Sequence, residues 1–143
     1  MKRINYYIIQ WTWGLLTNIL GLICAIGCLC MGGKFSMYRN AIDIELPYNC
    51  GGMSLGMFIF RGKNTNSILP HEYGHSIQNL KWGSLFIFVI GLPSLIRFCY
   101  RNYYYKNIYP NTRKSLPPYD SIWFEGQATQ LGNDAVNGKW NWL

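Results

Sequence analysis

The sequence Pro70-His71-Glu72-Tyr73-Gly74-His75 decides how the rest of this 143-residue chain is interpreted. Residues four apart lie on one face of an α-helix, so His71 and His75 can both direct an imidazole at a single ion. Glu72 is rotated from His71 by about 100°, which places its carboxylate beside a water held on that ion. The pattern predicts a metal-binding helix with Glu72 as general base; the alternative is a surface helix with this spacing by chance.

The limits of this helix follow from its flanking residues. Asn66 and Ser67 are both good helix caps, and Pro70 is tolerated in a first turn. We therefore expect a helix that begins near residue 66 and ends at about Trp82. His71 and His75 are the chain's two histidines, so a third metal ligand has to be a carboxylate or a cysteine.

Composition points to a membrane protein of one compact domain. Half of the residues are hydrophobic and 13% are charged, whereas an ordinary soluble domain carries about 25% charged residues. The net charge of +7 is spread around apolar segments and not massed on one stripe. This distribution argues against nucleic acid as a partner and favours a face toward anionic lipid headgroups.

Residues 1–33 are expected to form an N-terminal transmembrane anchor. Residues 8–31 are largely apolar, Trp11 and Trp13 suit an interfacial belt, and residues 14–31 carry no charge. A cleaved signal peptide is the alternative, although the apolar run exceeds the 7–15 residues of a typical signal core. The five cysteines include no C-x-x-C pair, which makes a cysteine zinc site a poor interpretation.

A small β-sheet is expected before the metal-binding helix. Residues 41–46 alternate apolar and polar side chains, and residues 54–61 form a second strand candidate. A strand just before such a helix can present a free edge to an extended peptide, which adds as one more strand. The edge positions would be Ser54, Leu55, Gly56, Met57 and Phe58. A purely structural hairpin is the alternative.

A second apolar stretch, residues 83–100, is interrupted by Gly91-Leu92-Pro93. Its marginal length and this interruption predict a segment that dips into the membrane and returns, or lies along the interface. Residues 101–119 are basic and rich in tyrosine, which indicates an interfacial collar, with stacking on single-stranded nucleic acid as the alternative. Because 11 of the 13 Lys and Arg residues follow the first span, the active-site face is expected in the cytoplasm.

The last expected helix spans about residues 120–132, with Asp120 or Ser121 as its cap and Gly132-Asn133 as its stop. With Glu72 reserved as base, the possible carboxylate ligands remain Asp43, Glu45, Asp120, Glu125 and Asp134.

The order of these motifs resembles the gluzincin zinc metallopeptidases, in particular the membrane-embedded branch with the CAAX prenyl proteases and the BlaR-type sensor proteases. That family has H-E-x-x-H on one helix, then an apolar segment, then a helix with E-x-x-A, which matches Glu125-Gly126-Gln127-Ala128. Over about residues 54–132, the resemblance implies that His71, His75 and Glu125 hold Zn²⁺ and that Glu72 is the general base. The family often has Asp where this chain has Thr129, a hydroxyl that can hydrogen-bond a ligating histidine but raises its basicity less.

The surroundings of Glu125 agree with this implication. It lies within an aromatic and apolar helix segment, where a carboxylate is costly to bury unless it is paired or metal-bound. Asp120 instead fits a helix cap, and Asp134 follows the expected stop. A solvated Glu125 on the outer helix face is the alternative. No histidine remains to stabilise an oxyanion, so a Tyr or Arg from residues 97–119 would have to.

The sequence therefore predicts a mainly α membrane protein with a small β-hairpin or sheet, an α+β chain with a zincin-like active-site helix and a second ligand helix. Residues 34–143 would form the metallopeptidase domain. The expected function is zinc-dependent hydrolysis of a peptide or membrane-protein substrate at the bilayer. The rival is a non-catalytic membrane protein with a structural zinc site, such as a scaffold, transport or immunity component.

Overall fold

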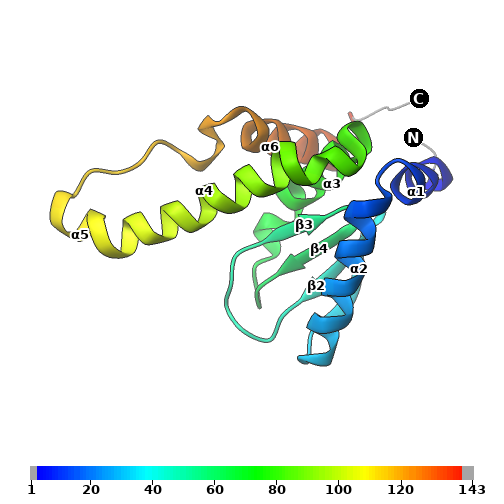
Figure 1. The fold of residues 1–143 in the computed structure, drawn as a ribbon, viewed down its shortest axis with the longest axis horizontal. Helices are drawn as coiled ribbons and strands as arrows, with labels where there is room; N and C mark the ends of the chain where they lie inside the picture. Colours follow the sequence, from blue (N-terminus) through cyan, green and yellow to red (C-terminus); the bar gives the residue numbers. More distant parts are fainter. Residues whose placement is uncertain (1–2, 140–143) are drawn as a thin grey trace.

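The computed structural model describes residues 3–139, which are mainly helical with one small sheet (Figure 1). The expected α+β class is confirmed. In chain order the main elements are α1 (Arg3–Thr12), α2 (Leu15–Cys30), β1 (Lys34–Tyr38), β2 (Ala41–Glu45), β3 (Met53–Leu55), β4 (Phe58–Arg61), α3 (Leu69–Trp82), α4 (Leu92–Tyr103), α5 (Tyr109–Thr112) and α6 (Trp123–Val136). Short 3-10 turns occupy Asn66–Ile68, Gly83–Leu85 and Tyr119–Ser121, and π-helical turns occupy Ile87–Gly91 and Tyr104–Ile108.

The N-terminal apolar segment is bent, because α1 and α2 meet at 94° around Gly14. The Asn18 side chain donates to the backbone carbonyl of Gln10 at 2.7 Å, and Asn79 of α3 donates to Gln10 Oε1 at 2.6 Å. A side chain at Gly14 would collide with that of Asn79. The apolar run over residues 8–31 is therefore not one continuous helix, because these buried amides hold the chain against α3, and the transmembrane anchor over residues 1–33 stays a prediction.

The sheet has four strands in the order β1-β2-β4-β3. The β1–β2 and β3–β4 pairs are antiparallel, and β2 and β4 are parallel. The strand expected over residues 54–61 is in fact two strands, joined by a tight turn at Gly56 and Met57. Gly56 has φ +63°, the conformation that glycine adopts at the first position of a type II′ turn. β3 is therefore an edge strand, whereas Phe58 belongs to the interior strand β4.

Helix α3 lies where the sequence placed it. The chain enters through the 3-10 turn Asn66–Ile68, Pro70 occupies the first turn of the helix, and the helix ends at Trp82. Neither Asn66 nor Ser67 caps the helix with its side chain, since the N-cap residue is Ile68. The helix ends where Gly83 takes φ +56°, at a point where a side chain would collide with Trp13.

The second apolar stretch does not turn back on itself. After a bend of 118° at the end of α3, the chain is helical from Ile87 to Thr112 and forms a long arm (Figure 1). The reversal comes at Arg113, which has φ +51°, and an extended segment leads back to α6. The chain does not turn at Gly91-Leu92-Pro93, because the π-helical turn Ile87–Gly91 accommodates Gly91 and Pro93 lies in the first turn of α4. That the stretch dips into the membrane and returns, or lies along the interface, stays a prediction.

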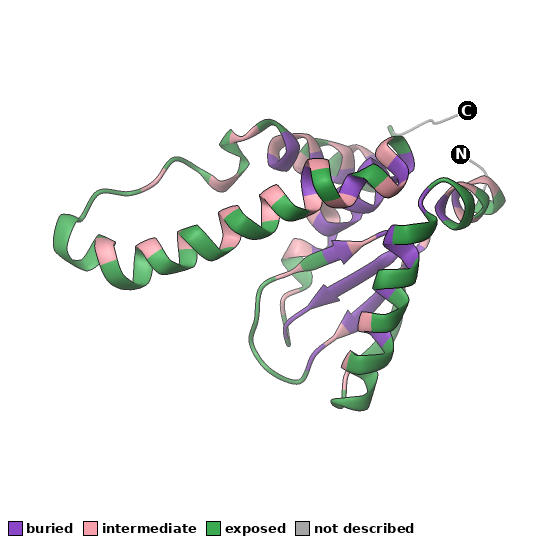
Figure 2. Cartoon of the chain, in the orientation of Figure 1, coloured by how far each residue is buried: buried purple, intermediate pink, exposed green. Residues whose placement is uncertain are grey.

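The core lies between α3 and the sheet, and the outer face of α2 and most of the arm are exposed (Figure 2). One hydrophobic cluster joins the N-terminal helices to the sheet and α3, and its members are Tyr6, Ala25, Ile44, Met57, Phe58, Phe60 and Leu80. Within residues 3–139 no single helix is both long and apolar enough to cross a bilayer, although two bent helix pairs together have suitable length and composition.

Candidate metal centre

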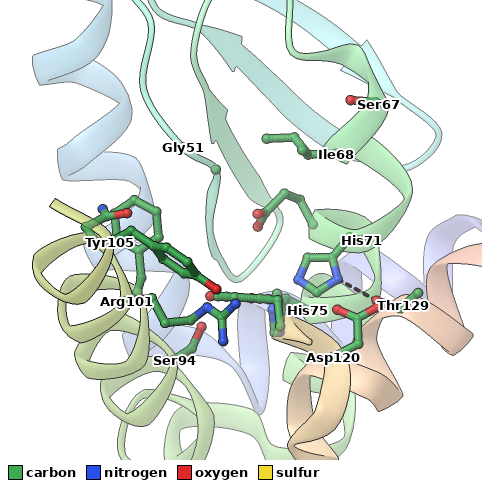
Figure 3. Close-up of a pocket in the computed structure, with 15 residues that line it drawn as sticks. Gly51, Ser67, Ile68, His71, His75, Ser94, Arg101, Tyr105, Asp120 and Thr129 are labelled. Atoms are coloured by element: carbon green, nitrogen blue, oxygen red, sulfur yellow. Dashed lines mark hydrogen bonds between the residues drawn. The ribbon is translucent and has the colours of Figure 1, made fainter. Parts of the chain in front are cut away.

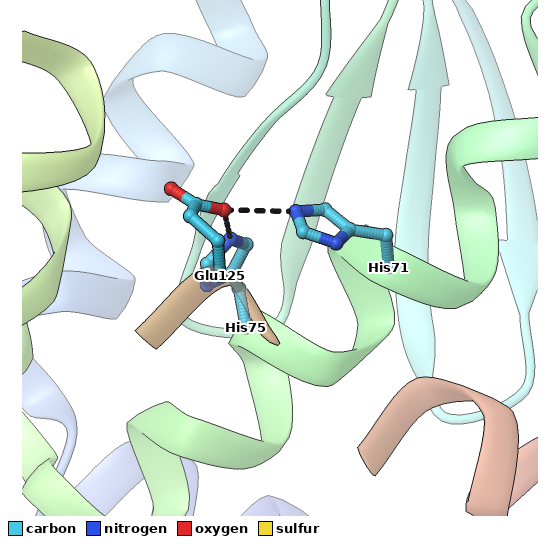
Figure 4. A group of neighbouring side chains, drawn as sticks. All are labelled: His71, His75 and Glu125. Carbon is cyan, nitrogen blue, oxygen red and sulfur yellow. Dashed lines mark hydrogen bonds and ion pairs between the residues drawn. The ribbon is translucent and has the colours of Figure 1, made fainter. Parts of the chain in front are cut away.

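Helices α3 and α6 bring three side chains together. His75 and Glu125 are buried and His71 is partly exposed. Glu125 Oε2 lies 3.1 Å from His71 Nε2 and 3.2 Å from His75 Nε2 (Figure 4). The three possible ligand atoms lie within 4.8 Å of one another. Among the described residues, this is the one such group of His, Cys, Asp or Glu side chains.

The other carboxylates considered from the sequence lie elsewhere. Asp43 and Glu45 form ion pairs with Arg61, at 2.9 Å for Asp43. Asp134 is not part of the group. Asp120 does not cap α6, because the N-cap residue is Ile122 and no side chain bonds to that helix end. The expected cap was wrong, because the Asp120 carboxylate instead accepts a hydrogen bond from Thr129.

Two glycines allow the close packing of α3 and α6. A side chain at Gly74 would collide with the backbone carbonyl of Ala128, and one at Gly132 would collide with that of Pro70. Gly132 lies inside α6, which continues to Val136, so the stop expected at Gly132-Asn133 was wrong. Gly132 thus serves helix contact, and not helix termination. The two contacts fix the register that sets Glu125 opposite the histidines.

The Nδ1 atom of each histidine, on the side of the ring away from Glu125, forms a hydrogen bond with a neighbouring side chain. His71 Nδ1 lies 2.8 Å from the Thr129 hydroxyl, which itself donates to Asp120 Oδ2 at 2.8 Å. His75 Nδ1 lies 2.7 Å from Gln78 Oε1, and the Gln78 amide donates to the Phe124 carbonyl at 2.8 Å. Since both partners use their donors elsewhere, each accepts a proton from Nδ1. The neutral form of each imidazole therefore has an unprotonated Nε2.

This arrangement suits a cation. Two unprotonated nitrogens and a carboxylate oxygen are all acceptors, and at these separations they repel unless a proton or metal ion lies between them. Among the described residues, Glu125 forms ion pairs with the two histidines and with no Lys or Arg. Its second oxygen, Oε1, accepts a hydrogen bond from Ser94 at 2.5 Å. Two imidazoles and one carboxylate are also a ligand set that zinc uses in catalytic sites.

The pKa values reflect the same contacts. Burial opposes the charged form of His75, but the hydrogen bond to Glu125 and the charges of Glu72 and Glu125 outweigh it and raise the His75 pKa. Burial would raise the pKa of Glu125, yet its hydrogen bonds with His71 and His75 hold that pKa far below the usual range. These contacts favour the protonated form of His75 and the charged form of Glu125.

Glu72 lies in the same cleft but outside the ligand group. Its buried carboxylate has the Ser54 hydroxyl 2.7 Å from Oε2, and it packs against Gly52, where a side chain would collide with it. The cleft has a volume of about 550 Å³ (Figure 3), and Glu72 lines it together with His71 and His75. A carboxylate so placed can reach a water bound in the cleft.

The partner of a developing oxyanion was expected among the tyrosines and arginines of residues 97–119, and Tyr119 of this range lines the cleft. Its ring lies 6.2 Å from that of His71, and the guanidinium groups of Arg97 and Arg101 lie 5.6 and 5.5 Å from its centre. Both arginines also donate to backbone carbonyls of the returning segment, Arg97 to that of Tyr119 at 3.0 Å. Burial, followed by the charge of Glu125, raises the Tyr119 pKa to about 12, so the phenol remains a donor.

The positions expected to form a substrate-binding edge separate into three groups. Ser54 and Leu55 lie in the edge strand β3, Gly56 and Met57 form the turn, and Phe58 pairs inside the sheet. Two contributing residues were not found from the sequence, Gln78 and Ser94, whereas Tyr119 lies within the range 97–119 that was expected to supply the oxyanion donor. Only Gln78 carried a usable signal, because it lies one helical turn after His75.

No protein-family model, curated protein or solved structure matches this chain.

Proposed function

We propose that this protein is a zinc-dependent metallopeptidase of gluzincin type, associated with a membrane. The observation that carries the proposal is the convergence of two imidazole Nε2 atoms on a buried carboxylate, with a second carboxylate in the same cleft. His71, His75 and Glu125 would hold the metal, which leaves a position open for water or substrate. Zinc bound there would supply Lewis acidity and lower the pKa of a bound water to about 7.

The residues of the chain supply the remaining roles. Glu72 takes a proton from the attacking water and delivers it to the leaving amine. Ser54 orients the Glu72 carboxylate through its hydroxyl. The Tyr119 phenol, which stays protonated at neutral pH, donates a hydrogen bond to the developing oxyanion. Strand β3 offers its free edge to an extended peptide, so that Ser54 and Leu55 lie beside the substrate backbone.

Exposed apolar side chains support the membrane assignment. They lie on α1, α2 and the beginning of the arm, and include Ile8, Trp11, Leu16, Ile19, Ile23, Ile26, Phe88, Leu92, Leu95 and Ile96. A surface of this kind is stable when lipid or another apolar partner covers it. The excess of Lys and Arg after the first apolar segment supports a cytoplasmic position for the site.

One observation favours a second candidate, a structural zinc site in a non-catalytic membrane protein. The contacts of Glu72 with Ser54 and Gly52 would also suit a carboxylate whose role is to join α3 to the sheet. The variant Glu72→Gln separates the two functions, because Gln keeps the shape but cannot accept a proton.

We expect Glu72→Gln to retain about one zinc per chain and to lose cleavage of a fluorogenic peptide mixture by at least about 100-fold. Zinc is measured by elemental analysis on detergent-purified protein. Asp134→Asn, outside the cleft, is the matched control and should keep both properties. Full activity in Glu72→Gln would contradict the mechanism, and zinc without cleavage in the wild type would favour the structural site.

A further inference from the structure

A second cavity, of about 500 Å³, adjoins the metal-site cleft. It lies between α2, the loop before β3, and the beginning of the arm, and it shares six lining residues with the cleft: Gly51, Gly52, His75, Ser94, Phe98 and Tyr119. A peptide held at the metal site therefore has this cavity beside it. Its volume falls within the range of about 300–1,000 Å³ that is typical of ligand pockets.

The walls of this cavity are apolar. The residues that line it and not the cleft are mostly aliphatic or aromatic, and they include Leu46, Leu55, Phe60, Phe86, Ile90 and Leu95. Among the described residues, no Asp, Glu, Lys or Arg is part of the lining. The hydroxyls of Ser54 and Ser94 already donate to Glu72 and Glu125. A charged group that entered would lose its hydration without an Asp, Glu, Lys or Arg partner in the lining, whereas an apolar group would gain from burial.

We infer that the cavity is a specificity pocket for a large apolar side chain next to the scissile bond, such as Phe or Leu. The inference rests on the proposed peptidase function and adds the substrate class. The inference depends on the wall that the two cavities share. His75 is a proposed metal ligand and also borders the second cavity. A peptide whose carbonyl lies at the metal would therefore have a neighbouring side chain at the mouth of this cavity. Charged and small side chains at that position bind poorly, because they leave the cavity hydrated or bury an unpaired charge.

Matched peptides test this inference. Two series of a quenched fluorescent peptide vary one residue each, on either side of the cleaved bond, among Phe, Leu, Ala, Ser and Asp. We expect kcat/KM to be about 10- to 100-fold higher for Phe or Leu than for Ala at one of the two positions, with Asp lowest. Wild-type protein that cleaves these peptides with no preference for Phe or Leu at either position would overturn the inference and leave the peptidase function intact.

A variant that fills the cavity gives a second test. Gly91 lines the cavity, has helical φ of −58°, and a Cβ there meets its nearest atom at 3.6 Å, so a side chain can be added. We expect Gly91→Leu to reduce the Phe-to-Ala preference by about 10-fold. Gly27→Leu is the matched control, because Gly27 lies in α2 with no neighbouring atom within 4 Å and outside the cavity. An unchanged preference in Gly91→Leu protein of wild-type zinc content would count against the pocket.

Binding distinguishes failure of the pocket from failure of catalysis. Fluorescein-labelled Phe and Ala peptides are titrated with zinc-loaded Glu72→Gln protein, and anisotropy reports the dissociation constants. The Phe peptide should bind about 10-fold more tightly, and Gly91→Leu should remove this difference. If the wild type cleaves nothing but the binding difference holds, the peptidase function fails and the apolar site stands. Equal binding of both peptides overturns the site.

Discussion

Thr129 donates a hydrogen bond of 2.8 Å to Asp120, and the same hydroxyl accepts from His71 Nδ1 at 2.8 Å. His71 therefore has a hydroxyl directly behind its Nδ1 atom, and a carboxylate behind that hydroxyl. This chain of two hydrogen bonds fixes the His71 tautomer and directs Nε2 toward Glu125. Asp120 supports the site from the 3-10 turn before α6.

The first prediction concerns this chain of hydrogen bonds. Thr129→Val removes both bonds at nearly constant shape and should weaken zinc affinity by about 10- to 100-fold, and Asp120→Asn should have a smaller effect. Zinc dissociation constants are measured by competition with a fluorescent chelator. Thr129→Asp in the Asp120→Asn background should restore affinity, because it places a carboxylate directly at His71. Wild-type affinity in Thr129→Val would show that the contact has no role in metal binding.

The second prediction identifies Glu125 as the third ligand. Glu125→Gln keeps the side-chain volume but removes the charge, so it should lose zinc during dialysis that leaves the wild type loaded. Asp134→Asn is the control and should keep its metal, since Asp134 is outside the ligand group. Full occupancy in Glu125→Gln would contradict the ligand assignment and the gluzincin interpretation with it.

The third prediction tests the contact between α3 and α6. Gly74→Ala and Gly132→Ala each place a methyl group against a backbone carbonyl, which should lower the free energy of unfolding by about 3 kcal/mol. Gly27→Ala adds the same methyl group to an open helical position and should be stabilising by about 0.5–1 kcal/mol. Chemical denaturation in detergent measures both. Equal stability of the three variants would mean that the helices do not require the close approach.

The fourth prediction is the pH dependence of the metal-free protein. The lowered Glu125 pKa contributes stability above the unfolded-state value of about 4.3, and this contribution disappears as the pH falls through the folded-state pKa. The raised His75 pKa contributes stability below the unfolded-state value of about 6.5, which is lost as the pH rises through the folded-state pKa. The melting temperature of metal-free protein should therefore be highest between about pH 4.5 and 6.5. Glu125→Gln should make the melting temperature depend less on pH. A pH profile identical to that of the wild type would show that Glu125 and His75 do not cause the dependence.

The sequence predicted the parts of the fold that follow from local pattern. The spacing of His71 and His75, with Pro70 before them, placed α3 correctly, and the apolar context of Glu125 placed the second helix. The errors came from contacts between distant segments. Asn79 reaches Gln10 across 69 residues to bend the N-terminal helices, and Pro70 opposes Gly132, which made a contact glycine look like a helix stop. Such pairings leave no periodic signal in a single sequence.

The glycine contacts between α3 and α6 also bear on how the proposed centre would acquire a metal ion. A zinc finger is unfolded until its ion binds, so part of the binding free energy is spent on ordering the chain. Here the helices α3 and α6, which carry the three proposed ligands, are joined by glycine contacts that involve no ligand atom. Thr129 and Gln78 already orient the two imidazoles through hydrogen bonds. A metal ion would therefore enter a site that is already assembled, could be exchanged while the chain remains folded, and would bind with an affinity that reflects the site alone.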